Sequence, residues 1–411
     1  MFNIGILGLG TVGSGVVEII RSRKDDLERL AGEDVQVKKI LVKDLSKKRN
    51  LEVDKALLTD RVEEIMNDDD INLVVEAISG VTDAYRYIVS ALKSGKHVVT
   101  ANKAVVSEYF QEIVELSKEK KCGFLFEACV GGGIPVIKQF VQNLTHINDI
   151  YSIKGILNGT SNYILTEMFN KNITYEEALV SAQRKGYAEA DPFDDVDGVD
   201  AARKLSILST IALKAKVYVD DVIRRGITSI LPTDIEVIKS LNFTIKLVGN
   251  FEMFGDEKYT SIVEPVLIKK NSMFSLVNDV NNIVSITASN VGEIQFYGIG
   301  AGKLATGNAI VSDLIDVIKG TYYGDFINFE SKVSSTNNKL FVGGYYIRVM
   351  YNSKAEGLKN ELDNLGLIKD IIKKDNYLIF ITTKISQEHL YFIIYDNVVR
   401  CDEAWYARIN D

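Results

Sequence analysis

Residues 3 to 13 of this chain read Asn3-Ile-Gly-Ile-Leu-Gly8-Leu-Gly10-Thr-Val-Gly13. A short apolar run enters the spacing G-x-G-x-x-G, and a helical pattern follows from Ser14 to Leu30. The first glycine permits a tight turn, the second lets the backbone approach a pyrophosphate, and the third lets the helix pack on the strand. The phosphates would lie at the helix N-terminus, where peptide N–H groups favour anions. The stretch predicts an α/β domain of the Rossmann type, with a doubly wound parallel sheet that binds a dinucleotide.

The composition limits the class of protein. With 411 residues, 46% of them hydrophobic and 25% charged, the chain has the size of two or three globular domains. Its net charge of −8 argues against nucleic acid or an anionic membrane as the main partner. The three cysteines do not make a disulfide framework. We find no secretory signal and no apolar run of about 18 residues, so the cytoplasm is the expected location.

The residues after the second strand are expected to meet the adenosine ribose. The pattern from Val35 to Val42 predicts this strand, and Lys43, Asp44 and the basic run Lys47 to Arg49 follow it. A basic group accommodates a 2′-phosphate, whereas a carboxylate binds a free 2′-hydroxyl. NADP is therefore the expected cofactor, and Asp44 keeps NAD possible. The candidate cofactor contacts in this half of the domain are Gly8, Gly10, Thr11, Val12, Gly13 and Lys43.

Two later segments extend the nucleotide domain. The apolar run from Ile71 to Ile78 predicts a buried strand that ends at Ser79 and Gly80, a small-residue edge where a nicotinamide ring could lie. Ser79 is therefore a candidate cofactor contact. Residues 122 to 135 predict a strand that enters a glycine-rich turn, which on its own could be no more than the hinge out of the domain.

Six carboxylates crowd residues 189 to 200, and only two cations, Arg203 and Lys204, follow them. Such a cluster repels itself unless it is solvated or receives a cationic substrate group. The run from Leu205 to Leu213 predicts a buried helix, and Asp200 and Lys204, four residues apart, share one face of it. The residues leave open whether this is an exposed ion pair or part of a substrate site.

The same stretch resembles the signature of homoserine dehydrogenases. Residues 186 to 192 read Gly-Tyr-Ala-Glu-x-Asp-Pro, and residues 194 to 204 read Asp-Asp-x-x-Gly-x-Asp-x-x-x-Lys. The resemblance extends from Met1 to about Tyr323, with Ser161 and Ala305 standing where the family usually has threonine and proline. The other motifs that carry it are Thr100-Ala-Asn-Lys103, Asn158-Gly-Thr-Ser-Asn-Tyr-Ile164 and Gly298-Ile-Gly300-Ala-Gly302.

This resemblance implies NAD(P)-dependent interconversion of L-homoserine and L-aspartate 4-semialdehyde. It implies that Lys204 hydrogen-bonds or protonates the reacting oxygen, with Asp200 beside it and Lys103 as the reserve candidate near the nicotinamide. The carboxylates around Lys204 favour its charged form, which suits a proton donor in aldehyde reduction. The implied substrate contacts are Glu189, Asp195 and Asp200, and the implied further cofactor contacts are Lys103, Gly300 and Gly302.

The resemblance also implies a bound sodium ion at the glycine-rich turn of residues 122 to 135. The ligands would be mostly backbone carbonyl groups, which leave no side-chain signature in a sequence. They are Glu127, Val130, Gly132 and Ile134.

The predicted domains are a dinucleotide-binding domain at 1–134, completed by 298–323, and an α+β substrate-binding and dimerisation domain at 135–297. A small ferredoxin-like, ACT-like domain is expected at 338–411, because Phe341 to Met350 and Tyr377 to Thr383 read as strands around a helix. Residues 352–357 replace the usual effector loop of ACT modules, so regulation by an amino acid is not expected there. The strand-rich middle domain predicts a homodimer or homotetramer.

Two other functions compete with this interpretation. The first is a thiol-dependent aldehyde dehydrogenase with Cys129 as its nucleophile, but no histidine of the chain lies in a suitable motif to serve as its base. The second is a non-catalytic dinucleotide sensor, which would leave Glu189, Asp200 and Lys204 without a purpose.

Overall fold

The computed structural model describes residues 1–49, 51–255, 258–322, 329, 334–335, 340–396 and 404–410. The chain divides into two compact units, which are described separately. Unit 1 comprises Met1–Ile150, Ser206–Val219 and Thr287–Ser331, and unit 2 comprises Tyr151–Leu205, Asp220–Ile286 and Lys332–Asp411. The predicted domain boundaries stay predictions, and Tyr323 and the start of the predicted C-terminal domain lie outside the described residues.

Unit 1 contains a parallel sheet with the strand order β3-β2-β1-β4-β5-β6. This is the order of a dinucleotide-binding fold, so the predicted doubly wound sheet is confirmed. Its strands are β1 (Phe2–Leu7), β2 (Val35–Leu41), β3 (Leu58–Thr59), β4 (Ile71–Glu76), β5 (His97–Thr100) and β6 (Phe124–Leu125). Strand β12 (Gly292–Ile299) also belongs to this unit but is not part of the six-stranded sheet.

Helices cover this sheet, with α1 packed on α12 and α4 on α5. A Cβ on Gly15 would lie 2.2 Å from the carbonyl oxygen of Lys303, so only glycine allows α1 and α12 to approach this closely. The helix predicted from Ser14 to Leu30 is in fact two helices, because Arg23 leaves the helical conformation (φ −119°, ψ 23°). The main helices are α1 (Thr11–Ser22), α2 (Lys24–Ala31), α3 (Glu63–Met66), α4 (Thr82–Lys93), α5 (Lys103–Lys120), α6 (Ile137–Gln139) and α12 (Lys303–Ile318).

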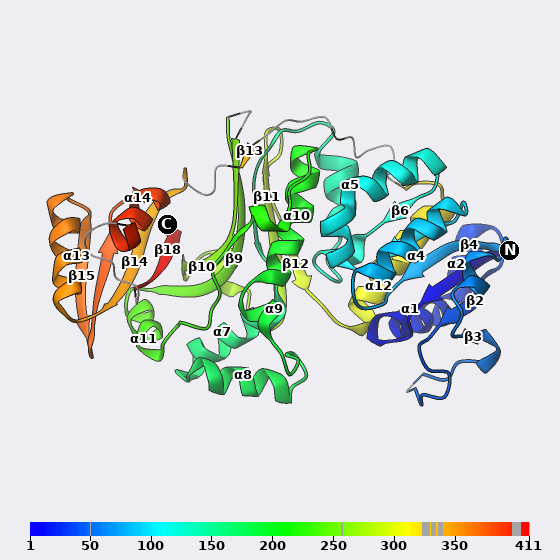
Figure 1. Ribbon diagram of the computed structural model, residues 1–411, viewed down its shortest axis with the longest axis horizontal. Coiled ribbons are helices and arrows are strands. Elements are labelled where there is room, and N and C mark those ends of the chain that lie inside the picture. The colour runs from blue at the N-terminus through cyan, green and yellow to red at the C-terminus, as the bar shows by residue number, and fades with distance from the viewer. Residues whose placement is uncertain are drawn as a thin grey trace. The chain divides into compact units, whose positions relative to one another are not determined.

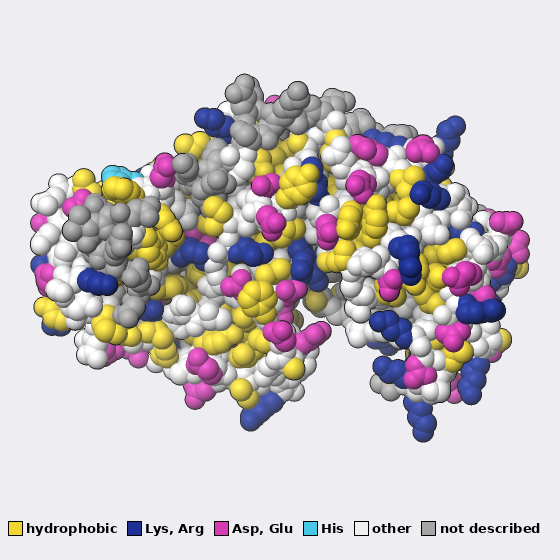
Figure 2. Space-filling view, viewed as in Figure 1, with side chains coloured by type: hydrophobic (Ala, Val, Ile, Leu, Met, Phe, Trp, Pro, Cys, Tyr) yellow, Lys and Arg dark blue, Asp and Glu magenta, His cyan; other side chains and the backbone are white. Residues whose placement is uncertain are grey.

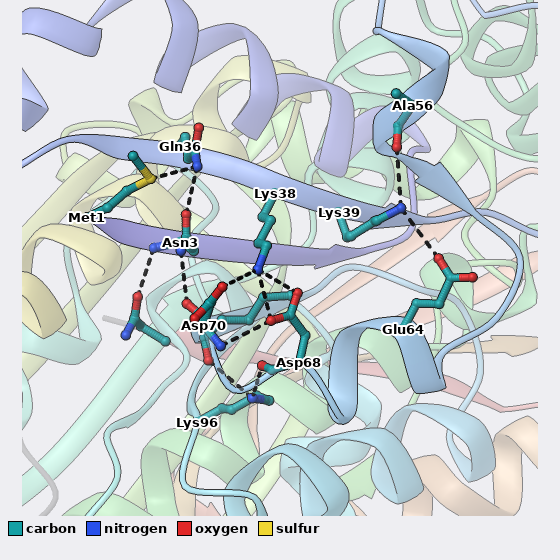
Figure 3. Close-up of polar contacts among 12 residues, drawn as sticks. Met1, Asn3, Gln36, Lys38, Lys39, Ala56, Glu64, Asp68, Asp70 and Lys96 are labelled. Atoms are coloured by element: carbon teal, nitrogen blue, oxygen red, sulfur yellow. Dashed lines mark hydrogen bonds and ion pairs between the residues drawn. The ribbon is translucent and has the colours of Figure 1, made fainter.

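A polar network closes the end of the sheet opposite the glycine-rich turn (Figure 3). The ammonium of Lys38 lies 2.8 Å from a carboxylate oxygen of Asp68 and 2.8 Å from one of Asp70. The buried Lys96 donates to the carbonyls of Asp68 and Ile71, at 2.7 and 3.2 Å. These lysines pair with backbone and carboxylate oxygens where β4 begins. Ligands of such sheets bind at the opposite, carboxyl end of the strands.

Unit 2 contains a long mixed sheet in which the strands run β11-β7-β9-β10-β18-β14-β16-β15. Strands β9 and β10 pair antiparallel over 12 residues each. The strands of its first half are β7 (Ile150–Ile156), β8 (Ile223–Arg224), β9 (Phe243–Phe254), β10 (Lys258–Lys269) and β11 (Asn281–Ala288). The helices beside them are α7 (Gly159–Lys171), α8 (Tyr175–Arg184), α9 (Phe193–Val196), α10 (Val199–Leu213) and α11 (Pro232–Ser240).

The C-terminal part of unit 2 has the β-α-β-β-α-β order of a ferredoxin-like fold, as predicted, with antiparallel neighbours in the order β18-β14-β16-β15 (orange to red in Figure 1). Residues 352–357, which stand where ACT modules have their effector loop, start the predicted helix, and the Asn352 side chain accepts the N–H groups of Lys354 and Ala355. The elements are β14 (Val342–Met350), α13 (Ser353–Asn364), β15 (Ile368–Lys374), β16 (Tyr377–Thr382), β17 (Ile385–Ser386), α14 (Gln387–Tyr391) and β18 (Trp405–Asn410), and the short β13 (Ser334–Ser335) pairs with β10.

The C-terminal strand β18 joins this module to the rest of unit 2 by pairing parallel with β10. At this seam the fully buried carboxylate of Glu264 accepts from Arg225 at 2.6 Å and from Arg408 at 2.7 Å. Burial alone raises the pKa of Glu264, but attraction to Arg408 and Arg225 outweighs it and holds the pKa below its usual range. The carboxylate is therefore an ionised link between the two parts.

We expect Glu264→Ala to lower the free energy of unfolding by about 3–5 kcal/mol, because it leaves two guanidinium groups without their buried partner. Urea denaturation followed by circular dichroism measures this. Asp363→Ala, at an exposed position on α13, is the control and should change stability by no more than about 0.5 kcal/mol. A Glu264→Ala protein as stable as this control would contradict the role of the link.

Candidate active site

The glycine-rich turn of unit 1 has the tight geometry that a dinucleotide requires. Gly8 has a φ of +99°, and a Cβ there would lie 2.6 Å from the Ala77 carbonyl oxygen. A Cβ on Gly13 would lie 2.0 Å from the Gly8 carbonyl oxygen, whereas Gly10 faces open space. Thr11 and Val12 begin helix α1 directly after this turn. The first and third glycines thus shape the turn, and the second leaves room for phosphate.

A space of about 310 Å³ opens beside this turn. Its walls carry four basic side chains, and Figure 2 shows Lys and Arg side chains gathered over the segment that follows β2 in Figure 1. Gly10 and Thr11 line it as predicted, while Lys43 is not one of its lining residues. The residues that line the space are Leu9, Gly10, Thr11, Ser14, Lys47, Lys48, Arg49, Leu51 and Lys303.

The carboxylate of Asp44 is engaged within its own turn. Its Oδ1 accepts from the hydroxyl of Ser46 at 2.6 Å and from the Ser46 N–H at 2.8 Å. These hydrogen bonds lower the pKa of Asp44. The Arg49 guanidinium donates to the Asp44 carbonyl at 2.6 Å, which folds the basic run back over the turn. Asp44 thus acts as a turn residue, and the cations of this segment line the space beside the phosphate site.

The ends of β4 and β5 are tied together beneath Ser79. The buried Glu76 carboxylate accepts from the Thr100 hydroxyl at 2.5 Å and from the Ile78 N–H at 2.9 Å, and its burial raises its pKa. The Asn102 amide donates to the Gly80 carbonyl at 2.8 Å and caps helix α5, which begins at Lys103. The structure therefore places Ser79 and Lys103 at the same carboxyl edge of the sheet.

The predicted contacts Gly300 and Gly302 lie where the chain returns to α12. A Cβ on Gly132 would lie 2.4 Å from the Gly300 carbonyl oxygen, so this segment packs against the turn of residues 131–133. The Gly133 N–H donates to the Ile299 carbonyl at 3.1 Å. Gly302 has a φ of +130° and precedes α12, a conformation that favours glycine.

Glu127, a predicted sodium ligand, holds the start of a helix. Its two carboxylate oxygens accept the N–H groups of Ile137 at 2.9 Å and Lys138 at 2.7 Å, and burial raises its pKa to about 7. The Ile134 carbonyl accepts from the Val136 N–H at 2.9 Å. In the described part of the chain, no group of three or more His, Cys, Asp or Glu side chains could hold a metal ion. Any cation here would therefore depend on carbonyl oxygens of the turn.

The predicted pair in unit 2 is buried and in contact. The Lys204 ammonium lies 2.7 Å from Asp200 Oδ2, and their side chains are 10% and 7% exposed. The same ammonium donates to the Leu157 carbonyl at 2.7 Å. Asp200 and Lys204 therefore share one face of α10, as their four-residue spacing predicted, and they form a buried rather than an exposed ion pair. Two of the three ammonium N–H groups have these partners, so one remains to meet a substrate oxygen.

Asn158 organises the carboxylates of this site, a role that the sequence did not reveal. Its amide Nδ2 donates to Asp195 Oδ1 at 2.6 Å and to Asp200 Oδ2 at 2.9 Å. Its Oδ1 caps helix α7 by accepting the Ser161 N–H at 2.8 Å. One amide thus relieves the repulsion between two carboxylates that the sequence places five residues apart. The sequence signal was the motif Asn158-Gly-Thr-Ser-Asn-Tyr-Ile164, which begins with this asparagine but does not show which side chains it contacts.

Glu189 lies in the exposed segment before α9. Its recorded hydrogen bond uses the backbone carbonyl, which accepts from the Gln183 side chain at 3.1 Å. The Thr160 hydroxyl donates to the Tyr187 carbonyl at 2.7 Å, so this segment is fixed to the first turn of α7, next to Asn158. The structure thus brings Asp195, Asp200 and Lys204 together, and leaves the Glu189 side chain in solvent.

Cys129 does not have the surroundings of a nucleophile. It is 1% exposed, and burial raises its pKa well above the usual range. Its sulfur lies 3.6 Å from the Thr100 carbonyl oxygen. A thiol in this state is a packing group, which removes the basis of the thiol-dependent alternative.

A glycine-shaped phosphate turn on a parallel sheet, together with a buried ammonium and carboxylate on a second unit, defines a nicotinamide-dependent dehydrogenase. Comparison with known proteins narrows this class. The family model for the NAD-binding domain of homoserine dehydrogenase matches residues 8–127, and the homoserine dehydrogenase model matches residues 135–315.

Individual relatives agree with these matches. The chain is 43% identical to the homoserine dehydrogenase of Bacillus subtilis (strain 168) over 321 residues, which is 78% of this chain and 74% of the relative. Its structure resembles that of a homoserine dehydrogenase from Thiobacillus denitrificans with a TM-score of 0.90 and 31% identity, covering 100% of this chain and 98% of that one. It also resembles the structure of a hyperthermophilic archaeal homoserine dehydrogenase in complex with NADPH. The TM-score is 0.66 and the sequence identity is 26%, and the match covers 80% of this chain and 99% of that one.

The chain belongs to the homoserine dehydrogenase family. It is an NAD(P)-dependent oxidoreductase that acts on the CH–OH group of homoserine and interconverts it with L-aspartate 4-semialdehyde. This confirms the predicted activity and favours it over the thiol-dependent enzyme and the non-catalytic sensor. Among the described residues, no helix is both long enough and apolar enough to cross a membrane.

We expect Lys204→Ala to lower kcat for homoserine oxidation and for aldehyde reduction by roughly 10²–10⁴-fold, because its ammonium is predicted to transfer the proton. Binding of the dinucleotide, followed by fluorescence titration, should be nearly unchanged. Arg203→Ala is the neighbouring control, since Arg203 pairs with Asp194 and not with Asp200. Equal losses of kcat in the two folded variants would show that the face of α10 has been assigned wrongly.

Proposed function

We propose that Lys204 is the proton donor of this homoserine dehydrogenase when the aldehyde is reduced. In the oxidation of homoserine, the same group takes the proton from the hydroxyl. The observation that carries this proposal is the position of its ammonium between Asp200 and the Leu157 carbonyl, each at 2.7 Å. Two fixed acceptors orient the third N–H toward a substrate oxygen. Such preorganised donors stabilise negative charge where it develops in the transition state.

The remaining carboxylates are proposed to bind the amino group of homoserine. Asp195 is half-buried and hydrogen-bonded to Asn158, whereas Glu189 is exposed on the adjoining segment. A carboxylate that meets the ammonium of the substrate does so in both the ground state and the transition state. Glu189 and Asp195 therefore contribute mainly to substrate affinity, and Asp200 and Lys204 to the chemical step.

NADP is the proposed preferred dinucleotide, with NAD usable. When bound, its reduced form would supply the hydride for aldehyde reduction, and its oxidised form would accept the hydride from homoserine. Lys47, Lys48 and Arg49 line the space beside the phosphate turn, and the Asp44 carboxylate is turned into its own loop. This arrangement suits a 2′-phosphate better than a free 2′-hydroxyl. Lys103 and Ser79, at the carboxyl edge of the sheet, are the proposed neighbours of the nicotinamide.

The double variant Lys47→Ala/Lys48→Ala should raise KM for NADP by about tenfold or more, because each charged hydrogen bond to a phosphate contributes about 1.5–3 kcal/mol. KM for NAD should change by less than about threefold. Lys24→Ala is the control, since Lys24 is an exposed lysine of α2 that pairs with Glu28 and lies outside the lining of this space. Steady-state kinetics with both dinucleotides measures the effect, and equal changes with NADP and NAD would contradict a contact with the 2′-phosphate.

Sodium binding is a further proposal, supported by the chemistry of the glycine-rich turn. Hard cations prefer oxygen ligands, and the buried turn at Gly131 and Gly132 has φ values of +76° and +57°, a conformation suited to glycine. The Glu127 carboxylate is already held by two amides, so the carbonyls of Val130 and Gly132 are the better candidates.

The chain is proposed to act as a homodimer or homotetramer in the cytoplasm. Strand β12 exposes the large apolar side chains of Tyr297 and Ile299, each 56% accessible, and such surfaces commonly contact a partner chain. The cysteines at 122 and 129 are buried and free, which suits a reducing compartment.

A further inference from the structure

Lys246, on strand β9, is a buried lysine outside the site described above. It is 1% exposed, and its ammonium donates to three oxygens: Val277 O at 2.6 Å, Asn162 Oδ1 at 3.1 Å and Asn278 Oδ1 at 3.1 Å. None of these acceptors is a carboxylate. Burial lowers its pKa to about 8, although attraction to Asp279 opposes this shift. Burying an ammonium costs desolvation free energy, which an apolar side chain at this position would avoid. The lysine therefore indicates that its three hydrogen bonds serve a role in the protein.

The three acceptors belong to two segments, and the lysine ties these segments together. Asn162 lies on the first turn of α7, while Val277 and Asn278 begin the loop 277–281. The Asn162 amide also donates to the loop, to the carbonyls of residues 277, 279 and 281 at 3.1, 3.1 and 3.2 Å. The N–H of Asp279, whose φ is +58°, donates to the Thr166 hydroxyl at 3.2 Å. The loop is thereby fixed along one face of α7.

This loop touches the backbone that carries the acid–base site. A Cβ on Gly159 would lie 2.8 Å from the Val280 carbonyl oxygen, so the loop packs directly against the first residue of α7. Gly159 follows Asn158, whose amide contacts Asp195 and Asp200. A displacement of the loop would therefore move the amide that holds Asp200 beside Lys204.

We propose that Lys246 is a positioning residue for the dehydrogenase reaction, which holds the loop 277–281 and the first turn of α7 so that Asn158 meets Asp195 and Asp200. This inference rests on the proposed roles of Asp200 and Lys204. An ammonium suits the task because it offers three donors from one atom, and the three oxygens that it meets come from a backbone carbonyl and two amide side chains. Methionine would fill the same volume but would remove the lysine donor from the two amide oxygens, whereas the Val277 carbonyl would keep its hydrogen bond from the Asn162 amide.

The test is a double-mutant cycle of Lys246→Met and Asn158→Ala, read as kcat for aldehyde reduction and KM for NADPH. Lys246→Met alone should lower kcat by about 10- to 100-fold, the effect of a small misplacement of catalytic groups, and leave KM for NADPH within about twofold. In the double variant kcat should fall no further than in Asn158→Ala alone, because Lys246 acts through Asn158. If the kcat losses of the two single variants multiply in the double variant, the two residues act independently and the inference is overturned.

Lys171→Met is the matched control, because Lys171 is a half-exposed lysine of α7 that pairs with Glu167 instead of the loop. It should retain wild-type kcat. If Lys246→Met does not fold, Lys246→Gln, which keeps a donor, takes its place in the same cycle. An unchanged kcat in a folded Lys246 variant would also overturn the inference. Lys204→Ala separates the two claims: if it keeps its kcat, the proposed function fails, whereas if only the Lys246 variants keep theirs, the inference alone fails.

Discussion

The active site depends on one buried interaction, the contact between the Lys204 ammonium and the Asp200 carboxylate. Removing both charges from water is costly, and their attraction alone does not repay this cost without further hydrogen bonds. The Leu157 carbonyl supplies one to the lysine, and the Asn158 amide supplies one to the aspartate. Leu157 and Asn158 are adjacent at the entry to α7, so the pair fixes where α7 must begin relative to α10.

Features set by local sequence could be predicted. The turn at Gly8 and Gly13 needs glycine because neighbouring backbone leaves no room for a Cβ, and the doubly wound parallel sheet was predicted from that motif. The meeting of Asp200 and Lys204 followed from their spacing on one helix. Near the C-terminus, two strands of the ferredoxin-like module, Phe341 to Met350 and Tyr377 to Thr383, and the helix between them were predicted from their patterns.

Features set by distant contacts could not be predicted. Asn158 lies 37 residues before Asp195, and no pattern in the sequence shows that their side chains meet. Lys246 lies in a run of β9 that reads as an ordinary strand, and its partners come from segments more than 30 residues away. The parallel pairing of β18 with β10, and the Glu264 link beside it, are hidden for the same reason. Lys43 and the basic run from Lys47 to Arg49 were expected at the 2′-phosphate; the basic run lines the space beside the phosphate turn, and the contact of Lys43 stays a prediction.

The most direct test of the account is the rate of aldehyde reduction by Asp200→Asn beside the wild type at saturating NADPH. The substitution keeps the shape of the side chain and removes the carboxylate that lies 2.7 Å from the Lys204 ammonium. Without this partner the ammonium is no longer held toward the substrate oxygen, so kcat should fall by roughly 10²-fold or more while binding of the dinucleotide stays nearly unchanged. A folded variant with the kcat of the wild type would contradict the claim that Asp200 keeps Lys204 ready to donate.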